Sequence, residues 1–215
     1  MNVVLSAINI WFLVRLLPFG FNAGVAGLLS GMLFWPRLLP LAGFVLTCTI
    51  LGFATRALAG IRFDFRQTAL RLGLAFALCF WVPAASLGLG LVLAWSGWLA
   101  VPMPQLTDIH AALGIVGAVL LLLGAVGSVV VPMFQGTAPV RPRWLAAWMG
   151  VLVAAVLLFA YLRWREVAAP GTIAGLLAIP VASFAIGLGI LHGRAPHRRN
   201  PTLVGFWRLG ALSLL

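Results

Sequence analysis

The sequence is short of charge, and acidic side chains are almost missing from it. Its 215 residues include three carboxylates, Asp64, Asp108 and Glu166, and no lysine. Charged residues make up 8% of the chain, against about 25% in an average soluble protein. Hydrophobic residues make up 63% of it. A water-soluble domain cannot bury so much apolar surface, so the sequence predicts an integral membrane protein whose solvent is the lipid bilayer.

The shortage of carboxylates excludes several classes of function. No two of the three share a predicted site, which leaves paired acid–base catalysis unsupported. The HExxH, Walker A, GxSxG and Rossmann motifs are missing as well. No buried acidic–basic pair marks an ion path of the kind found in pumps and coupled transporters. The sequence therefore contains no complete catalytic site, and Asn22 and Gln135 are the main polar residues in its predicted spans.

Cysteine is also scarce, since Cys48 and Cys79 are the two in the chain. They fall in separate apolar runs and form no CxxC motif. We interpret them as small packing residues within the membrane, with no metal or disulfide role.

The apolar runs are about 20 residues long and do not alternate with polar residues, which favours membrane-spanning helices over barrel strands. The predicted fold is an all-α, polytopic transmembrane helix bundle of about six to seven spans plus a partial C-terminal span, in one domain over residues 1–215. The predicted spans are Val3–Leu17, Phe19–Trp35, Leu38–Leu58, Thr68–Leu99 with Pro83 inside it, Asp108–Phe134, Trp144–Leu162, Gly171–Leu191 and a partial span from Thr202 to Leu215.

The partial span has fourteen residues and contains Arg208, whereas crossing a bilayer takes about 20 apolar residues. We therefore expect the chain to be a fragment, completed by missing helices of the same protein or by a partner membrane subunit.

All fourteen basic residues are arginines, and their distribution predicts the orientation. One side of the predicted topology has eleven: Arg15, Arg56, Arg62, Arg66, Arg71, Arg141, Arg143, Arg194, Arg198, Arg199 and Arg208. The other side has Arg37, Arg163 and Arg165. The first side is predicted to be cytoplasmic, in a bacterial inner membrane. The net charge of +11 suits lipid headgroups rather than nucleic acid, because no basic stripe is interleaved with aromatic residues.

Small residues at helical spacing predict close helix packing in lipid. Such spacing occurs in Gly20-x3-Gly24, in Gly27-x3-Gly31 and in Gly171-x3-Gly175. Further candidates for helix packing are Gly114, Gly117 and Gly124.

His110 stands at the start of the predicted span Asp108–Phe134, near the outer face. Thr107 or Asp108 is expected to cap this helix, and the positive end of the helix dipole then favours a neutral imidazole at His110. A neutral imidazole suits a haem or metal ligand, although a single histidine near a membrane surface is more often structural. His192 and His197 are predicted on the opposite face, on the order of 30 Å away. A haem at His110 would therefore need either a partner helix from elsewhere or a five-coordinate iron.

One segment resembles a helix of the haem–copper oxidase subunit I superfamily, which includes nitric oxide reductases and NnrS-like proteins. The resemblance is carried by His110-x2-Leu113-Gly114-x2-Gly117, by Gly124, and by Val131-Pro132-Met133-Phe134-Gln135. Segments Pro142–Trp144 and Asn200–Gly210 are similar to permease-like relatives of that superfamily. The oxidases have His-x-His where this chain has Asp108-Ile109-His110, and their copper-binding His-His pair is missing here. The resemblance therefore implies one haem, with His110 as its axial ligand, and argues against a two-metal active site.

Three functions remain open on the sequence. The first is a haem–copper-oxidase-like or NnrS-like protein of the inner membrane that binds haem and is linked to respiration or to the nitric oxide response. The second is a cofactor-free permease or transporter, and the third is a structural subunit of a larger membrane complex.

Overall fold

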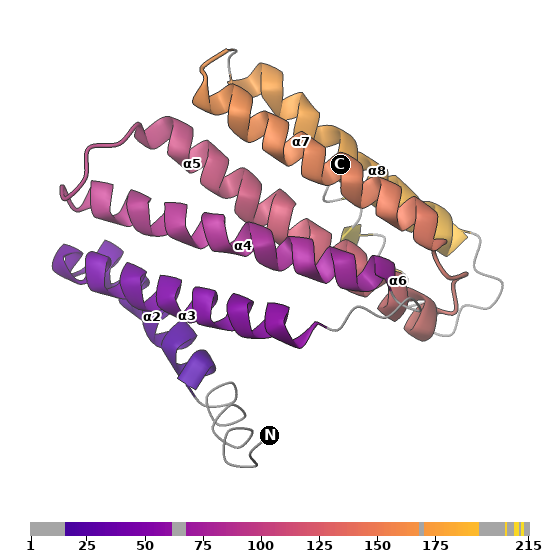
Figure 1. Ribbon diagram of the computed structural model, residues 1–215, viewed down its shortest axis with the longest axis horizontal. Coiled ribbons are helices and arrows are strands. Elements are labelled where there is room, and N and C mark those ends of the chain that lie inside the picture. The colour runs from indigo at the N-terminus through magenta and orange to yellow at the C-terminus, as the bar shows by residue number, and fades with distance from the viewer. Residues whose placement is uncertain are drawn as a thin grey trace. The chain divides into compact units, whose positions relative to one another are not determined.

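The computed structural model describes residues 16–61, 68–167 and 170–193, together with residues 205, 209, 210 and 212 (Figure 1). All regular structure in these residues is helical, which confirms the predicted all-α class. The predicted span Val3–Leu17 and the predicted partial span Thr202–Leu215 lie mostly outside the described residues, as do Asp64 and His197.

The described helices are α2 (Leu17–Leu33), η2 (Pro36–Leu38), α3 (Leu39–Gly60), α4 (Thr68–Trp95), α5 (Met103–Ala111), η4 (Ala112–Leu120), α6 (Leu121–Gln135), α7 (Pro142–Trp164) and α8 (Pro170–Gly193). The segments α5, η4 and α6 follow one another without a break. Segment η4 is a π-helix, in which each hydrogen bond reaches one residue further along the chain than in an α-helix.

Five helices of the described chain are long and apolar enough to cross a bilayer, so this is a multi-pass membrane protein. They are Pro36–Gly60, Thr68–Trp95, Met103–Gln135, Pro142–Trp164 and Gly171–Gly193. The prediction of six to seven complete spans is wrong for this part of the chain. The described part of helix α2 has 17 residues, about 25 Å at 1.5 Å per residue, which is short of the ~30 Å hydrocarbon core. It ends at Leu33 because Pro36 disfavours a helical conformation at Trp35.

Prolines and glycines set the other helix ends. Pro142 stands at the first turn of α7, where its missing N–H costs no helical hydrogen bond. Gly136 closes α6 with a φ of 64°, a left-handed conformation that glycine adopts without strain, and its N–H donates to Pro132 O. Exposed tryptophans near the helix ends, such as Trp35, Trp98 and Trp164, suit the membrane–water interface.

The chain divides into two compact units. Unit 1 consists of Met1–Ile61 and Leu78–His110, and unit 2 of Arg62–Ala77 and Ala111–Leu215. Helix α4 begins in unit 2 and ends in unit 1, and the boundary at His110 falls just before the π-helix. The prediction of a single membrane domain stays a prediction.

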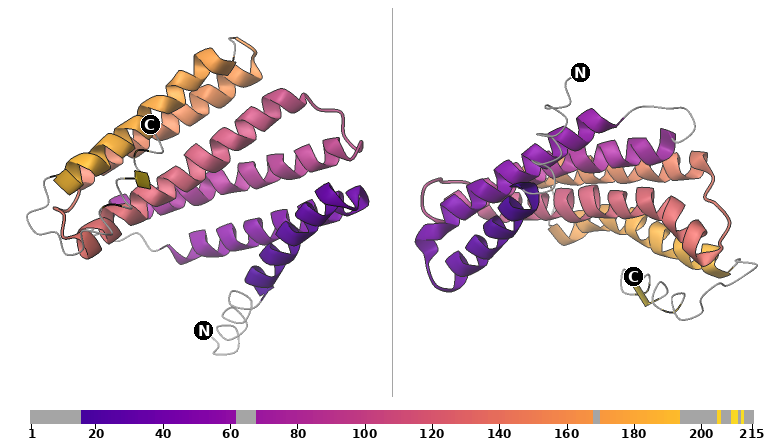
Figure 2. Two further views of the ribbon diagram at one scale, coloured as in Figure 1. Left: turned by 180° about the vertical axis from the view of Figure 1, so that it is seen from behind. Right: turned by 90° about the horizontal axis from the view of Figure 1, so that it is seen from below.

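Unit 1 contains an antiparallel hairpin of α2 and α3, drawn in indigo and purple (Figure 2). Four glycines of α2, which we call the glycine stripe, face α3 at close range. The opposed pairs are Gly20 with Thr49, Gly24 with Leu46, Gly27 with Ala42 and Gly31 with Leu39. A side-chain carbon added at Gly24 would lie 2.8 Å from Leu46 Cβ and 3.0 Å from Leu46 Cα. The two backbones therefore approach so closely that no side chain fits between them.

In unit 2, helix α7 packs against both the continuous helix η4–α6 and α8, and η4 also contacts α8. Near one end, Ala112 of η4, Phe159 of α7 and Ile173 of α8 form a core cluster. Near the other end, Val131 of α6 packs with Ala185 and Leu188 of α8. These two clusters fix α6 and α8 as parallel neighbours.

Two glycine predictions in unit 2 have different outcomes. The indole of Trp148 covers Gly124 so closely that a side chain there would overlap the ring. Gly171 and Gly175, in contrast, have no described atom within 4 Å of the position of an added carbon, so the packing predicted for this pair is not found within the described residues and stays a prediction.

Candidate functional site

His110 lies inside a helix rather than at its start. Helix α5 begins at Met103, five residues before the predicted start at Asp108. The predicted cap at Thr107 or Asp108 is therefore wrong, and the Thr107 hydroxyl instead donates to Met103 O at 2.8 Å within the helix. Proline is tolerated in a first helical turn, so Pro104 does not prevent this earlier start.

The earlier start also removes the electrostatic argument for His110. The field of a helix end falls off within about one turn, and His110 is the eighth residue of α5. The protonation pattern of the ring is set instead by a hydrogen bond to a neighbouring helix.

The His110 ring bonds to the backbone of α4. Its Nδ1 lies 2.8 Å from Ala84 O. A carbonyl oxygen only accepts, so Nδ1 carries the proton and donates it. In the neutral ring, Nε2 then carries the lone pair. Metal-binding histidines are commonly oriented in this way, with one ring nitrogen bonded to a carbonyl and the other facing the metal.

Gly88 makes room for the imidazole, one helical turn after Ala84. A side-chain carbon added at Gly88 would lie 3.0 Å from His110 Cε1 and 3.7 Å from Nε2. The His110 ring therefore packs directly against the backbone of α4 at Gly88. Sequence reasoning missed this glycine, because it lies 22 residues from His110 and no local pattern connects the two.

Thr47 of α3 makes a second bond to the same stretch of α4. Its hydroxyl donates to Ala85 O at 3.3 Å, and the residue is buried. Two successive carbonyls, those of Ala84 and Ala85, thus receive side chains from α5 and α3. Both follow Pro83, the proline inside α4. Polar links of this kind hold helices together in lipid.

The π-helix begins two residues after His110. Its nine residues include Gly114, which is half-buried, and Gly117, which is buried. Such segments are rare and are found frequently at functional sites. No sequence pattern indicated this π-helix, since the apolar residues of the stretch suit an α-helix equally well.

His192, the other histidine that the structure describes, belongs to unit 2. His192 is buried in α8, where its Nδ1 lies 2.8 Å from Leu188 O, one turn earlier in the same helix. Among the described residues, no three His, Cys, Asp or Glu side chains are grouped so that they could hold a metal ion. Within the described structure, His110 is thus not part of a group of three or more such residues.

Both cysteines are exposed free thiols, so the interpretation of Cys48 and Cys79 as packing residues is wrong. An apolar run does not show which of its residues face a neighbouring helix and which face lipid.

Two polar side chains are buried at the end of α6, on either side of Gly136. Gln135 is 2% exposed and Thr137 is 7% exposed. Gln135 Oε1 and Thr137 Oγ1 have no hydrogen-bond partner among the described residues. The sequence pointed to Gln135 as a polar exception but gave no reason to consider Thr137, which follows the helix in a loop.

Comparison of the chain with protein-family models, with curated proteins and with solved structures gives no match.

Proposed function

We propose that this protein is a haem–copper-oxidase-like or NnrS-like protein of the bacterial inner membrane, in which His110 binds one haem, and that it serves respiration or the response to nitric oxide. The observation that carries the proposal is the 2.8 Å contact between His110 Nδ1 and Ala84 O. It orients the ring and directs the lone pair of the neutral imidazole to Nε2.

His110 fits an axial ligand in its tautomer, its fixed orientation and its partial burial. In the part of the chain described here, Ala84 O would hold the ring and Gly88 would allow its close approach to α4. A bound haem would supply one-electron or gas-binding chemistry at its iron. A sixth ligand, where present, would come from a partner membrane subunit or a further helix. The absence of paired carboxylates favours a binding role over a catalytic one.

The same hydrogen bond also supports the cofactor-free alternative, in which His110 only links α5 to α4. An interhelical bond in lipid averages about 0.6 kcal/mol, so this structural role needs no ligand. The two readings differ in what a substitution does to haem binding.

The test is haem binding by the purified protein, measured as Soret absorbance after reconstitution with haem b. We expect a Soret band in the wild type, its loss in His110→Gly and its recovery when imidazole is added to that variant. His192→Ala is the matched control, since it removes a buried, carbonyl-bonded histidine from unit 2 and should keep the band. Absence of haem in the wild type, or an unchanged band in His110→Gly, would reject the proposal and favour the cofactor-free alternative.

A further inference from the structure

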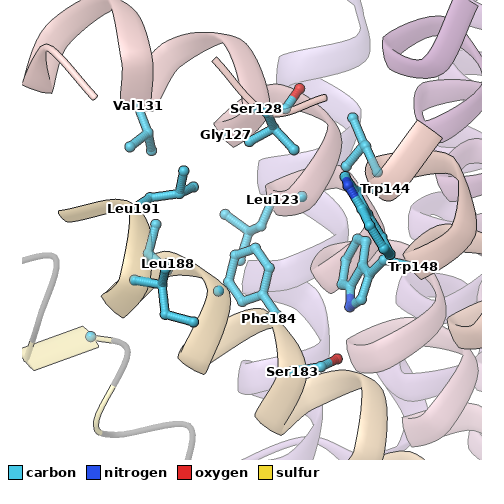
Figure 3. A pocket seen from close by; sticks show the side chains of 16 residues that line it. Leu123, Gly127, Ser128, Val131, Trp144, Trp148, Ser183, Phe184, Leu188 and Leu191 are labelled. Carbon is cyan, nitrogen blue, oxygen red and sulfur yellow. The ribbon is translucent and has the colours of Figure 1, made fainter. Parts of the chain in front are cut away.

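Unit 2 contains an apolar cleft of about 940 Å³ between α6, α7 and α8 (Figure 3). Its walls include Leu123 of α6 and Leu188 of α8, and the rings of Trp148 and Phe184 stand side by side within it. The two ring centres are 5.5 Å apart. The cleft lies among helices long enough to span the bilayer, so hydrocarbon has direct access to it.

Glycines create much of this space. Gly127 of α6 and Gly187 of α8 both line the cleft, and no described atom lies within 4 Å of a side-chain carbon added at either position. The first carbon of a larger side chain at either position would therefore meet no described part of unit 2. Substitution at these glycines is thus a way to fill the cleft from its own wall.

Three polar side chains of the cleft wall donate hydrogen bonds to the backbone of unit 2. Ser128 Oγ donates to Ala125 O at 2.6 Å, and Ser183 Oγ donates to Pro180 O at 3.0 Å. The indole Nε1–H of Trp148 donates to the same Pro180 O at 3.0 Å. These donors are occupied, so the wall offers little to a polar substrate. A hydrocarbon chain, which needs no hydrogen bonds, is the chemistry that matches it.

One end of the cleft reaches the start of α7, where the residues change in character. Val140 and Trp144 line this end, and the exposed Arg141 and Arg143 lie between them in the sequence. The Arg143 guanidinium lies 5.8 Å from the centre of the Trp144 ring. Tryptophan is typical of the membrane interface, and arginine binds phosphate through its planar set of N–H donors. The apolar cleft thus ends beside two exposed arginines, Arg141 and Arg143.

We infer that this cleft binds an acyl chain of one anionic phospholipid, whose phosphate is held by Arg141 and Arg143. The inference rests on unit 2 alone and does not depend on haem binding at His110. Binding at this cleft would make the protein prefer anionic over zwitterionic lipid at one site, in addition to the general attraction between its basic loops and anionic lipid.

The test uses nanodiscs containing a small fraction of phospholipid with brominated acyl chains, which quench nearby tryptophans. The signal of Trp148 is taken as the difference between the wild type and Trp148→Phe. We expect brominated phosphatidylglycerol to compete for the site roughly 30-fold better than brominated phosphatidylcholine, since each arginine near an anionic headgroup contributes roughly fivefold. Arg141→Gln combined with Arg143→Gln should remove this preference and leave quenching by phosphatidylcholine unchanged.

Cleft-filling variants provide the second arm. Gly187→Leu and Gly127→Leu should abolish the preferential quenching. Gly150→Leu should retain it, because Gly150 is equally open but lies outside the cleft. Equal quenching by the two lipids, or full quenching in Gly187→Leu, would overturn the inference.

Gly210 also lines the cleft, so the chain itself is the competing occupant. The substitutions Gly187→Cys and Gly210→Cys, made in a background with Cys48→Ser and Cys79→Ser, distinguish the two occupants. Efficient cross-linking that phosphatidylglycerol does not reduce would reject the lipid, whereas cross-linking that this lipid suppresses would support it.

Discussion

Glycines at similar helical spacing face a neighbouring helix in unit 1 and an open cleft in unit 2. In α2 the glycine stripe meets α3, and a carbon added at Gly24 or Gly27 would lie 2.8 Å from an α3 Cβ atom. Around the cleft, a carbon added at Gly127 or at Gly187 would have no described atom within 4 Å. The same residue type thus allows close contact in one unit and leaves room for a ligand in the other. Spacing alone does not distinguish the two roles.

The largest expected effect tests this difference directly. Gly24→Leu should lower the free energy of unfolding by about 2–3 kcal/mol, because the new side chain overlaps the α3 backbone. Gly187→Leu should change it by less than about 0.5 kcal/mol. Both substitutions gain similar helix propensity, so the contrast isolates packing. Unfolding in mixed micelles, followed by circular dichroism, measures both. Equal losses of unfolding free energy in the two variants would show that Gly24 and Gly187 are packed equally closely.

A smaller effect is expected at Trp148, whose indole covers Gly124 in the wall of the cleft. Trp148→Phe keeps an aromatic ring over Gly124 but removes the donor to Pro180 O. We expect a loss of about 1 kcal/mol, which lies between the average of about 0.6 kcal/mol and the maximum of about 1.7 kcal/mol for an interhelical hydrogen bond in lipid. The same unfolding measurement applies. No measurable loss would mean that lipid or water replaces this bond in the variant.

The smallest effect is expected in unit 1, at Thr47. Thr47→Val keeps the shape of the side chain and removes the donor to Ala85 O, a bond of 3.3 Å. This length is at the long limit for a hydrogen bond, so we expect a loss of about 0.5 kcal/mol or less. Thr55→Val serves as the control, because its hydroxyl bonds within its own helix. A loss larger than that of Trp148→Phe would reverse the proposed order of the two links.

The sequence predicted the helices of this protein better than their surroundings. Long apolar runs without alternation left α-helices as the way to satisfy the backbone in lipid, and the five spanning helices follow from that constraint. Their ends were harder to predict. Thr107 and Asp108 have the side chains of helix caps, yet both lie inside α5, because capping preference does not exclude an interior position.

The environment of His110 could not be predicted from the sequence. His110 itself stood out as a polar residue beside an apolar run. Its partners, Ala84 O and Gly88, are a backbone atom and a residue without a side chain, so neither has a sequence signature. Their contact depends on the antiparallel packing of α4 and α5, which brings together residues more than twenty positions apart.

Composition by itself determined that this chain is a helical membrane protein, because 63% hydrophobic residues and 8% charged residues leave lipid as the solvent. Only the tertiary structure decided which glycines are covered, which cysteines face outward, and which nitrogen of His110 holds the proton. The physical reason is that lipid favours every apolar face of a helix almost equally. Hydrophobicity therefore selects the helix, and close contacts and hydrogen bonds between helices select its neighbours.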